Sequence, residues 1–247
     1  MDDPLLTINR VRYLHLLESV LTGTLTRDPP ADPWSRREYD KAKRDLGQDW
    51  PATALTMIGT ARMRQLRHAC EDVLKQGIPG DFIETGVWRG GACIYMRAIL
   101  EAWGATDRTV WAADSFRGLP PPRLTQDAGD QHHTFEQLAV SLAEVDENFT
   151  RFGFPDIKVL VGWFADTLPA APIERLAILR LDGDMYESTG TALNALYPRL
   201  SSGGFCIVDD YNLAPCRSAV LDYWQANKIE AEMHDIEGMG VYWRKGG

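Results

Sequence analysis

The chain has 247 residues, 45% of them hydrophobic, which is sufficient for one full hydrophobic core. Its formal net charge of −9 argues against a nucleic-acid partner, because binding to phosphates depends on Lys and Arg side chains. The sequence has no signal-peptide pattern and no run of about 18 apolar residues, so we expect a cytoplasmic protein that does not bind a membrane.

Two helices are expected in the first part of the chain. They cover residues 6–22 and 61–77, and in the second one apolar residues recur at three- and four-residue steps. The sequence between them is polar and interrupted by proline, which predicts a loop or a partly helical cover. We therefore divide the chain into an N-terminal helical extension, residues 1–60, and one main domain, residues 61–247.

After Gly80 the pattern changes to short apolar runs that are separated by segments of helix length. Buried strands that alternate with helices predict an α/β fold with a doubly wound, mostly parallel sheet. A polar segment, residues 120–137, interrupts this alternation and is either an active-site lid or a plain surface excursion. The predicted strands are 81–85, 109–114, 157–164, 176–182, 203–210 and 240–244.

Acidic residues and glycines follow nearly every predicted strand. Ligands of open parallel sheets bind beyond the carboxyl ends of the strands, so we expect these residues to share one edge of the sheet. They are Glu84, Thr85, Gly86, Asp114, Ser115, Gly162, Trp163, Phe164, Asp182, Asp184, Asp209 and Asp210.

The first strand of the main domain turns into a helix through Gly86, Gly90 and Gly91. Glycine there lets a ligand approach the backbone, and the helix N-terminus presents free N–H groups. A P-loop would need Lys followed by Ser or Thr after Gly91, and a dinucleotide fingerprint would need a glycine in place of Glu84. A carboxylate repels pyrophosphate but accepts hydrogen bonds from a cation. The ligand is therefore expected to be cationic, unless the glycines merely cap a tight turn.

Asp114 ends the next predicted strand. An acid at this position suits the two hydroxyls of a ribose, although it could also cap the following turn. Trp163 and Phe164 could flank an adenine ring or belong to the core.

Two strands end in pairs of aspartates, Asp182 with Asp184 and Asp209 with Asp210. Four clustered carboxylates repel one another unless a positive group lies among them, and a hard cation such as Mg²⁺ prefers oxygen ligands of this kind. The alternative is that these acids cap the helices that follow, and we favour that role for Asp184.

Five linked motifs resemble those of the macrocin O-methyltransferase (TylF) family, a group of class I, Rossmann-like, S-adenosylmethionine-dependent methyltransferases. The motifs are ETGVWRGGACI, ADSFRG, GWFADTLP, LRLDGDMY and VDDYN, in this order. The resemblance runs from Thr56 and Met57 to residues 240–244. It implies transfer of a methyl group from S-adenosyl-L-methionine to a sugar hydroxyl of a macrolide or related antibiotic, with Mg²⁺ as a cofactor. We therefore expect a small glycosylated acceptor, and we also expect a homo-oligomer.

The resemblance also assigns roles to individual residues. Asp182, Asp209 and Asp210 would hold Mg²⁺, which makes a bound hydroxyl more acidic, and Asp182 is the candidate general base. The donor would be bound by Thr56, Met57, Glu84, Thr85, Gly86, Arg89, Gly90, Gly91, Asp114, Ser115, Gly162, Trp163 and Phe164. The less recognisable residues 1–60 and 120–137 would choose the acceptor.

Three other functions stay open at this stage. The same metal chemistry would serve O-methylation of a phenol or catechol. The Asp182-Gly-Asp184 sequence formally fits the DxD motif of a nucleotide-sugar glycosyltransferase, although Glu84 and the absence of a basic cluster speak against a diphosphate. A non-catalytic binding module that keeps the nucleotide site is the third possibility.

Overall fold

A seven-stranded sheet runs through the middle of the computed structural model, which describes residues 4–246. The strand order is β3-β2-β1-β4-β5-β7-β6, in which β1 to β5 are parallel, β7 is antiparallel to β5, and β6 is antiparallel to β7. The strands are β1 (Asp81–Thr85), β2 (Val110–Asp114), β3 (Lys158–Val161), β4 (Leu176–Leu181), β5 (Leu200–Val208), β6 (His234–Ile236) and β7 (Gly240–Arg244).

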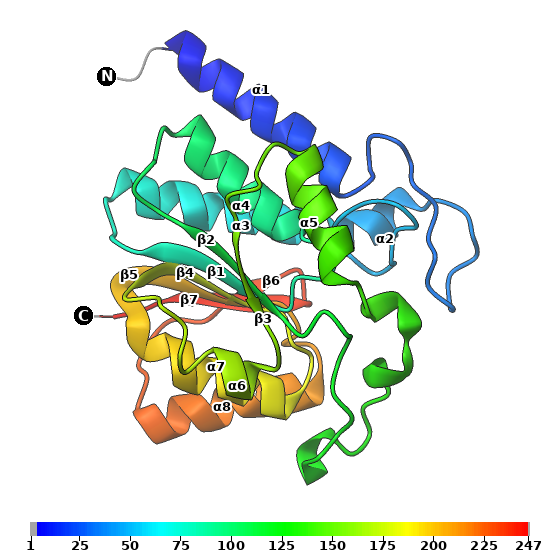
Figure 1. Ribbon diagram of the computed structural model, residues 1–247, viewed down its shortest axis with the longest axis vertical. Helices are drawn as coiled ribbons and strands as arrows, with labels where there is room; N and C mark the ends of the chain where they lie inside the picture. Colours follow the sequence, from blue (N-terminus) through cyan, green and yellow to red (C-terminus); the bar gives the residue numbers. More distant parts are fainter. Residues whose placement is uncertain (1–3, 247) are drawn as a thin grey trace.

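Helices cover both faces of this sheet (Figure 1). The face covered by α3, α4 and α5 also carries α1 as an outer element, and α6, α7 and α8 cover the other face. The helices are α1 (Pro4–Leu21), α2 (Lys41–Leu46), α3 (Gly59–Lys75), α4 (Gly91–Ala102), α5 (Leu142–Arg151), α6 (Phe164–Thr167), α7 (Tyr186–Leu196) and α8 (Ala214–Asn227). Among residues 4–246, no helix combines the length and apolar content that crossing a membrane requires.

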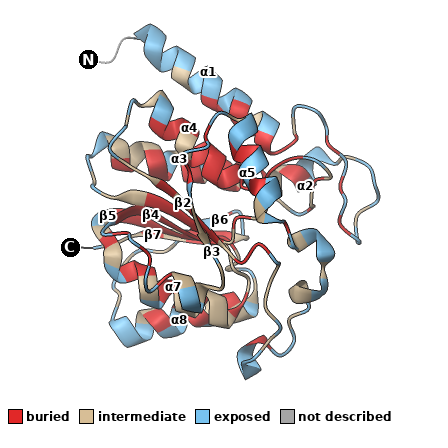
Figure 2. Ribbon diagram, in the orientation of Figure 1, coloured by how far each residue is buried: buried red, intermediate tan, exposed pale blue. Residues whose placement is uncertain are grey.

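The central strand β4 is apolar except for Arg180, because the strand is buried on both faces of the sheet. All six of its residues are buried, and successive side chains point to opposite faces of the sheet. Ile178 joins the hydrophobic cluster that includes α3 and α4, whereas Leu179 joins the cluster that includes α7 and α8. Figure 2 shows the same distribution, with buried residues gathered in the sheet and on the inner sides of the helices.

The predicted α/β fold with its mostly parallel sheet is confirmed, and three details differ from the expectation. The short antiparallel strand β6 was not predicted, because three residues give no readable alternation. The strand predicted to reach Phe164 ends at Val161, because Gly162 adopts a φ of 140° and Phe164 begins α6. The strand predicted for 203–210 begins earlier, at Leu200.

The polar part of the extension is organised by a buried ion pair. Arg44 of α2 is fully buried, and its Nε and Nη2 groups each donate to the Asp49 carboxylate at 2.8 Å. The same guanidinium donates to the carbonyl oxygens of Thr22 and Asp28. The Asp28 carboxylate in turn accepts the backbone N–H of Thr53 at 2.8 Å. Buried hydrogen bonds therefore hold this cover beside the main domain, together with the aromatic contact between Trp34 and Trp50.

Candidate active site

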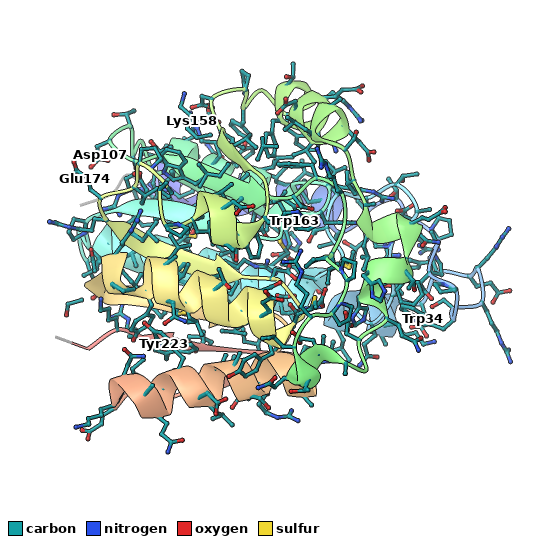
Figure 3. All side chains as sticks on the ribbon, turned by 60° about the horizontal axis from the view of Figure 1, so that its bottom comes forward. Trp34, Asp107, Lys158, Trp163, Glu174 and Tyr223 are labelled. Atoms are coloured by element: carbon teal, nitrogen blue, oxygen red, sulfur yellow. The ribbon has the colours of Figure 1, made fainter. Side chains whose placement is uncertain are left out.

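A cavity of about 540 Å³ lies beyond the carboxyl ends of the parallel strands. Residues of the main domain, the extension and the 120–137 insertion all line it. Figure 3 shows Trp163 and Trp34 towards the insertion, whereas Asp107 and Glu174 lie at the opposite end of the sheet. The predicted site residues that line the cavity are Met57, Gly86, Asp114, Ser115, Gly162, Trp163, Phe164, Asp182, Asp209 and Asp210.

Gly86 follows β1 and lies against the backbone of Asp182, which follows β4. Its φ is 87°, and a Cβ atom at this position would lie 1.6 Å from the carbonyl oxygen of Asp182. The backbone N–H of Asp182 donates to the Thr85 carbonyl oxygen at 2.8 Å. Glycine is therefore required here, and it brings the end of the first strand against the aspartate at the end of the fourth.

The rest of the predicted glycine turn lies behind the cavity wall. A Cβ atom on Gly91 would lie 2.5 Å from the Leu55 carbonyl oxygen, to which the Gly91 N–H donates at 3.0 Å. Arg89 donates to the carbonyl oxygens of Pro51 and Ala54 at 3.1 and 2.9 Å. The N-terminus of α4 is thus covered by the extension. The predicted residues outside the cavity lining are Thr56, Glu84, Thr85, Arg89, Gly90 and Gly91.

Asp114 holds the loops that flank the end of β2, and it lines the cavity. Its Oδ2 accepts the Val87 N–H at 2.8 Å, and its Oδ1 accepts the Phe116 N–H at 2.7 Å, so the carboxylate holds both flanking loops. Burial raises its pKa, and the backbone N–H groups of Phe116 and Val87 oppose that rise. The Ser115 hydroxyl also donates to Oδ1 at 3.5 Å, and Asp114 lines the cavity, where its role as the ribose ligand stays a prediction.

Asp182, Asp209 and Asp210 come together as predicted. One carboxylate oxygen from each lies within 4.8 Å of the other two. Oxygens that share one Mg²⁺ at about 2.1 Å lie up to about 4.2 Å apart, so the spacing fits such an ion after a small adjustment. Burial and the neighbouring Asp184 and Asp182 raise the pKa of Asp210 well above its usual range. The cluster therefore carries more negative charge than its surroundings compensate.

Two arginines lie among these carboxylates, and the sequence interpretation missed both. Arg180 of β4 is only 1% exposed; its Nη1 donates to Asp182 Oδ2 at 2.7 Å, and its Nη2 donates to Asp209. Arg62 of α3 donates to the other oxygen of Asp209. Two guanidinium groups nevertheless face five carboxylates, so a divalent cation is compatible with the charge of the site. The carboxylates are Glu84, Asp182, Asp184, Asp209 and Asp210.

Glu84 is placed as a partner of Arg180 behind the cavity. Its Oε1 accepts from Arg180 Nη1 at 2.5 Å, and its Oε2 accepts from the Cys93 thiol at 3.0 Å. Burial raises the pKa of Glu84 to about 7, against the opposing effect of Arg180. Through Arg180, Glu84 is linked to the carboxylates of Asp182 and Asp209.

The expected helix-capping role of Asp184 is wrong. Asp184 has a left-handed φ of 57°, and its backbone N–H donates to Asp210 Oδ2 at 3.0 Å. The free N–H groups of Tyr186 and Glu187 at the start of α7 instead donate to the Asp127 carboxylate at 2.7 and 3.0 Å. Asp127 is fully buried and belongs to the insertion. No local sequence signal could have found this cap, because it comes from a segment about sixty residues away.

Three aromatic rings from the extension and the insertion meet beside the cavity. Trp34 and Trp50 of the extension meet edge to face at 4.6 Å, and Phe135 of the insertion lies 6.0 and 5.5 Å from them. Trp34 and Trp50 line the cavity, as does His132 of the insertion. The two segments that the sequence singled out for acceptor choice therefore meet above the site.

The sequence is similar to known O-methyltransferases over nearly its whole length. The model of the family described as macrocin-O-methyltransferase (TylF) matches residues 10–245. An 8-demethyl-8-(2,3-dimethoxy-alpha-L-rhamnosyl)-tetracenomycin-C 4'-O-methyltransferase of Streptomyces olivaceus is 48% identical over 94% of this chain and 92% of its own length. The mycinamicin III 3''-O-methyltransferase of Micromonospora griseorubida is 44% identical over 94% of this chain and 96% of its own length.

The fold is similar to that of a solved relative. The O-methyltransferase NovP superposes with a TM-score of 0.91 at 46% identity, covering 96% of this chain and 100% of NovP. A calicheamicin methyltransferase, CalS11, superposes with a TM-score of 0.65 at 18% identity, which supports the fold only.

Proposed function

The chain belongs to the macrocin O-methyltransferase (TylF) family and is therefore an S-adenosylmethionine-dependent O-methyltransferase, and from this premise we propose that it methylates a sugar hydroxyl of a glycosylated, antibiotic-type natural product. The relatives described above carry names of enzymes that act on glycosylated antibiotics. The observation that carries the proposal is that Asp114 and the three-aspartate cluster line one cavity.

The donor is proposed to lie along the ends of β1, β2 and β3. The Asp114 carboxylate, fixed by two backbone N–H groups, accepts the ribose hydroxyls. Trp163 and Phe164 flank the adenine from the turn that follows β3. Gly86 lines the cavity and lies against the Asp182 backbone, so a donor bound beside it would direct its methyl group towards the aspartate cluster. Glu84 and the other residues behind the wall fix the shape of this pocket.

Asp182, Asp209 and Asp210 are proposed to hold Mg²⁺. When bound, the ion would lower the pKa of a coordinated sugar hydroxyl and orient it towards the donor. Asp209 accepts from Arg62 and Arg180, and a carboxylate has four acceptor positions, so it can share its oxygens between these groups and a cation.

Asp182 is proposed as the general base. Arg180 holds its Oδ2 at 2.7 Å, which leaves Oδ1 to accept the hydroxyl proton. As that proton moves to Asp182, the hydroxyl oxygen forms a bond to the methyl carbon. The bond from this carbon to sulfur breaks, and the electron pair stays on sulfur as a neutral thioether. Alignment matters more than charge stabilisation here, because the donor loses its positive charge during transfer.

A panel of acceptors tests the proposed substrate class. Purified protein would be incubated with S-adenosylmethionine, Mg²⁺ and either alkyl and aryl rhamnosides or catechols, and methylated products would be identified by mass spectrometry. Methylation of glycosides at a sugar oxygen, with catechols slower by at least tenfold, supports the proposal. Preferential methylation of catechols would contradict the sugar assignment while leaving the O-methyltransferase activity intact.

A further inference from the structure

The insertion contributes an imidazole to the cavity, and neither the proposed donor pocket nor the aspartate cluster uses it. Within residues 120–137, the polar side chains that line the cavity are those of Arg123 and His132. Arg123 is exposed, whereas His132 is partly buried in a short 3₁₀ turn, His132–Thr134. Ligand cavities carry few polar groups, and those that are held in place fix the orientation of the ligand. Of the two side chains, His132 is therefore the better candidate for such a contact.

Asp130 holds the His132 side chain in place. Its Oδ1 accepts the backbone N–H of His132 at 3.2 Å and lies 2.6 Å from Nδ1 of the His132 ring. The Asp130 side chain is only 8% exposed, and its Oδ2 is buried without a hydrogen-bond partner among residues 4–246. A carboxylate beside Nδ1 favours the tautomer that carries its proton on that nitrogen. Nε2 is then the ring nitrogen left for a ligand.

Contacts to α7 bring His132 to the aspartate end of the cavity. The backbone N–H of Asp130 donates to the Asp127 carbonyl oxygen at 2.8 Å, and the Asp127 carboxylate accepts the Tyr186 N–H at 2.7 Å. Tyr186 begins α7 two residues after Asp184, which lines the same cavity. Burial raises the pKa of Asp184 to about 7, and the nearby His132 opposes this rise. A sugar with one hydroxyl at the aspartate cluster would therefore have neighbouring hydroxyls close to His132.

The alternative is that His132 only packs the insertion together. Its ring lies 6.1 Å from the Phe135 ring, measured between centroids, and Phe135 contacts Trp34 of the extension. Packing of this kind does not need the Asp130 carboxylate beside Nδ1, because a carboxylate without enough partners is costly to bury and an apolar side chain would pack against Phe135 without that cost. The pair of Asp130 and His132 therefore favours a contact with a ligand.

We propose that Nε2 of His132 hydrogen-bonds a sugar hydroxyl next to the one that is methylated, and so determines which oxygen reaches the donor. This role rests on the proposed sugar acceptor, because a pyranose carries hydroxyls on adjacent carbons. When one of them reacts at the aspartate cluster, its neighbour contacts the imidazole. A site that hydrogen-bonds a substrate hydroxyl discriminates against ligands that lack it. His132 is thus a specificity-determining residue, and Asp130, which does not line the cavity, is a positioning residue.

Monodeoxy glycosides test this role. Rates of methyl transfer would be measured with an aryl rhamnoside and with analogues that each lack one of its non-reacting hydroxyls. Wild type should lose about tenfold in kcat/KM with the analogue that lacks the hydroxyl contacted by His132, the effect of one hydrogen bond. In His132→Ala the intact rhamnoside should be slower by a similar factor, and the same deoxygenation should have no further effect. Methylation at a second sugar oxygen, detected by NMR of the products, should increase in this variant.

Matched variants separate the contact with a ligand from a structural role. His133→Ala is the control, because His133 is partly buried in the same turn but does not line the cavity, and it should keep the wild-type selectivity. His132→Gln should restore part of the preference, since its amide can take the place of Nε2. Asp130→Asn should weaken the preference. The affinity for S-adenosylmethionine, measured by calorimetry, should be unchanged in all four variants.

The two ways in which this experiment can fail are distinguishable. If His132→Ala matched wild type, or lost the same factor as wild type with each deoxy analogue, His132 would not contact the sugar, while the proposed sugar acceptor would stand. If wild type methylated no glycoside, the proposed function would be wrong, and the role of His132 with it.

Discussion

At the scale of single residues, Arg180 links the donor side of the site to the aspartate cluster. It is a buried guanidinium whose partners, Glu84, Asp182 and Asp209, follow or end three different strands. The positive charge of Arg180 therefore offsets part of the repulsion among the carboxylates even without a bound metal ion. Its removal should be costly, because buried acids would be left without a partner.

Arg180→Met should lower the free energy of unfolding by about 3–5 kcal/mol, the cost of breaking a buried ion pair from one side. Urea unfolding in EDTA measures this directly. The control is Arg97→Met, whose ion pair with Asp156 at 2.9 Å lies near the surface and should contribute less than about 1 kcal/mol. Equal effects of the two changes would show that Arg180 does not stabilise the cluster.

Glu84→Gln should alter the pH dependence of stability. The Glu84 pKa is 4.5 in an unfolded reference and about 7 in the fold, so between these values the folded chain keeps a proton that the unfolded chain has lost. Glu84 therefore makes stability fall as pH rises from 4.5 to about 7, and glutamine removes that fall. Melting temperatures of wild type and Glu84→Gln would be compared in EDTA at about pH 5 and about pH 8, on either side of most of this range.

The matched control for this change is Glu174→Gln, because Glu174 is exposed at the other end of the sheet (Figure 3). It should keep the pH dependence of wild type. If Glu84→Gln also kept the wild-type pH dependence, the raised pKa of Glu84 would be wrong.

Asp114→Ala should weaken donor binding by about 1.5–3 kcal/mol, or roughly 10- to 150-fold, if the carboxylate accepts ribose hydroxyls. Calorimetry with S-adenosylmethionine measures the change. Asp107→Ala is the control, since Asp107 is exposed at the far end of β2 and should leave the affinity unchanged. If the Asp114→Ala variant bound the donor with wild-type affinity, Asp114 would not be a ribose ligand and would only fix its flanking loops.

The carboxylates of the site could be predicted from sequence, whereas their partners could not. Asp114, Asp182 and Asp209 follow apolar strands, so the parallel sheet brings them to one edge. The pairing of Arg62 with Asp209 joins residues 147 positions apart and depends on the side-chain direction of α3. Arg180 carried a signal, a charge inside an apolar strand, but the sequence did not say which acids it would meet.

At the scale of elements, the strands were the most predictable and the polar segments the least. A strand buried on both faces gives a readable apolar run, as β4 does. The insertion and the cover around α2 depend instead on buried polar contacts made by Asp127 and Arg44, which look like surface residues in the sequence. Such contacts are long-range and leave no local pattern.

The insertion is anchored to α7 at Asp127, and Asp127→Ala should release it. The two N–H groups at the start of α7 would lose their acceptor, which costs about 0.5–2 kcal/mol. Limited proteolysis should then cleave residues 120–137 faster than in wild type. Gln126→Ala is the control, because Gln126 is exposed in the same segment. Unchanged cleavage in the Asp127→Ala variant would mean that other contacts hold the insertion.

Binding should have the opposite effect on this segment. We predict that residues 120–137 become more ordered when donor, metal and acceptor are all present, because His132 lines the cavity that these ligands fill and Phe135 contacts Trp34, which also lines it. Equal cleavage rates with and without the ligands would contradict this prediction and show that the ligands do not order the insertion.

At the scale of the whole molecule, the sequence predicted the sheet, the edge that carries the site and the family. The five motifs that carry the resemblance all lie at the carboxyl ends of parallel strands, where chemistry constrains the residues most. The polar part of the extension was predicted to be a loop or a partly helical cover, and the insertion a lid or a surface excursion; the two meet at Trp34 and Phe135. Their arrangement depends on contacts between segments that lie far apart in the sequence.

The central claim is that the protein transfers a methyl group to a sugar hydroxyl with a metal held by the aspartate cluster and with Asp182 as the base. The most direct measurement is the rate of glycoside methylation by wild type in Mg²⁺, by wild type in EDTA, and by Asp182→Asn in excess Mg²⁺. The account predicts activity in the first, none in the second with donor binding retained, and a kcat at least about 10²-fold lower in the third. Full activity in EDTA, or an Asp182→Asn variant as fast as wild type, would contradict it.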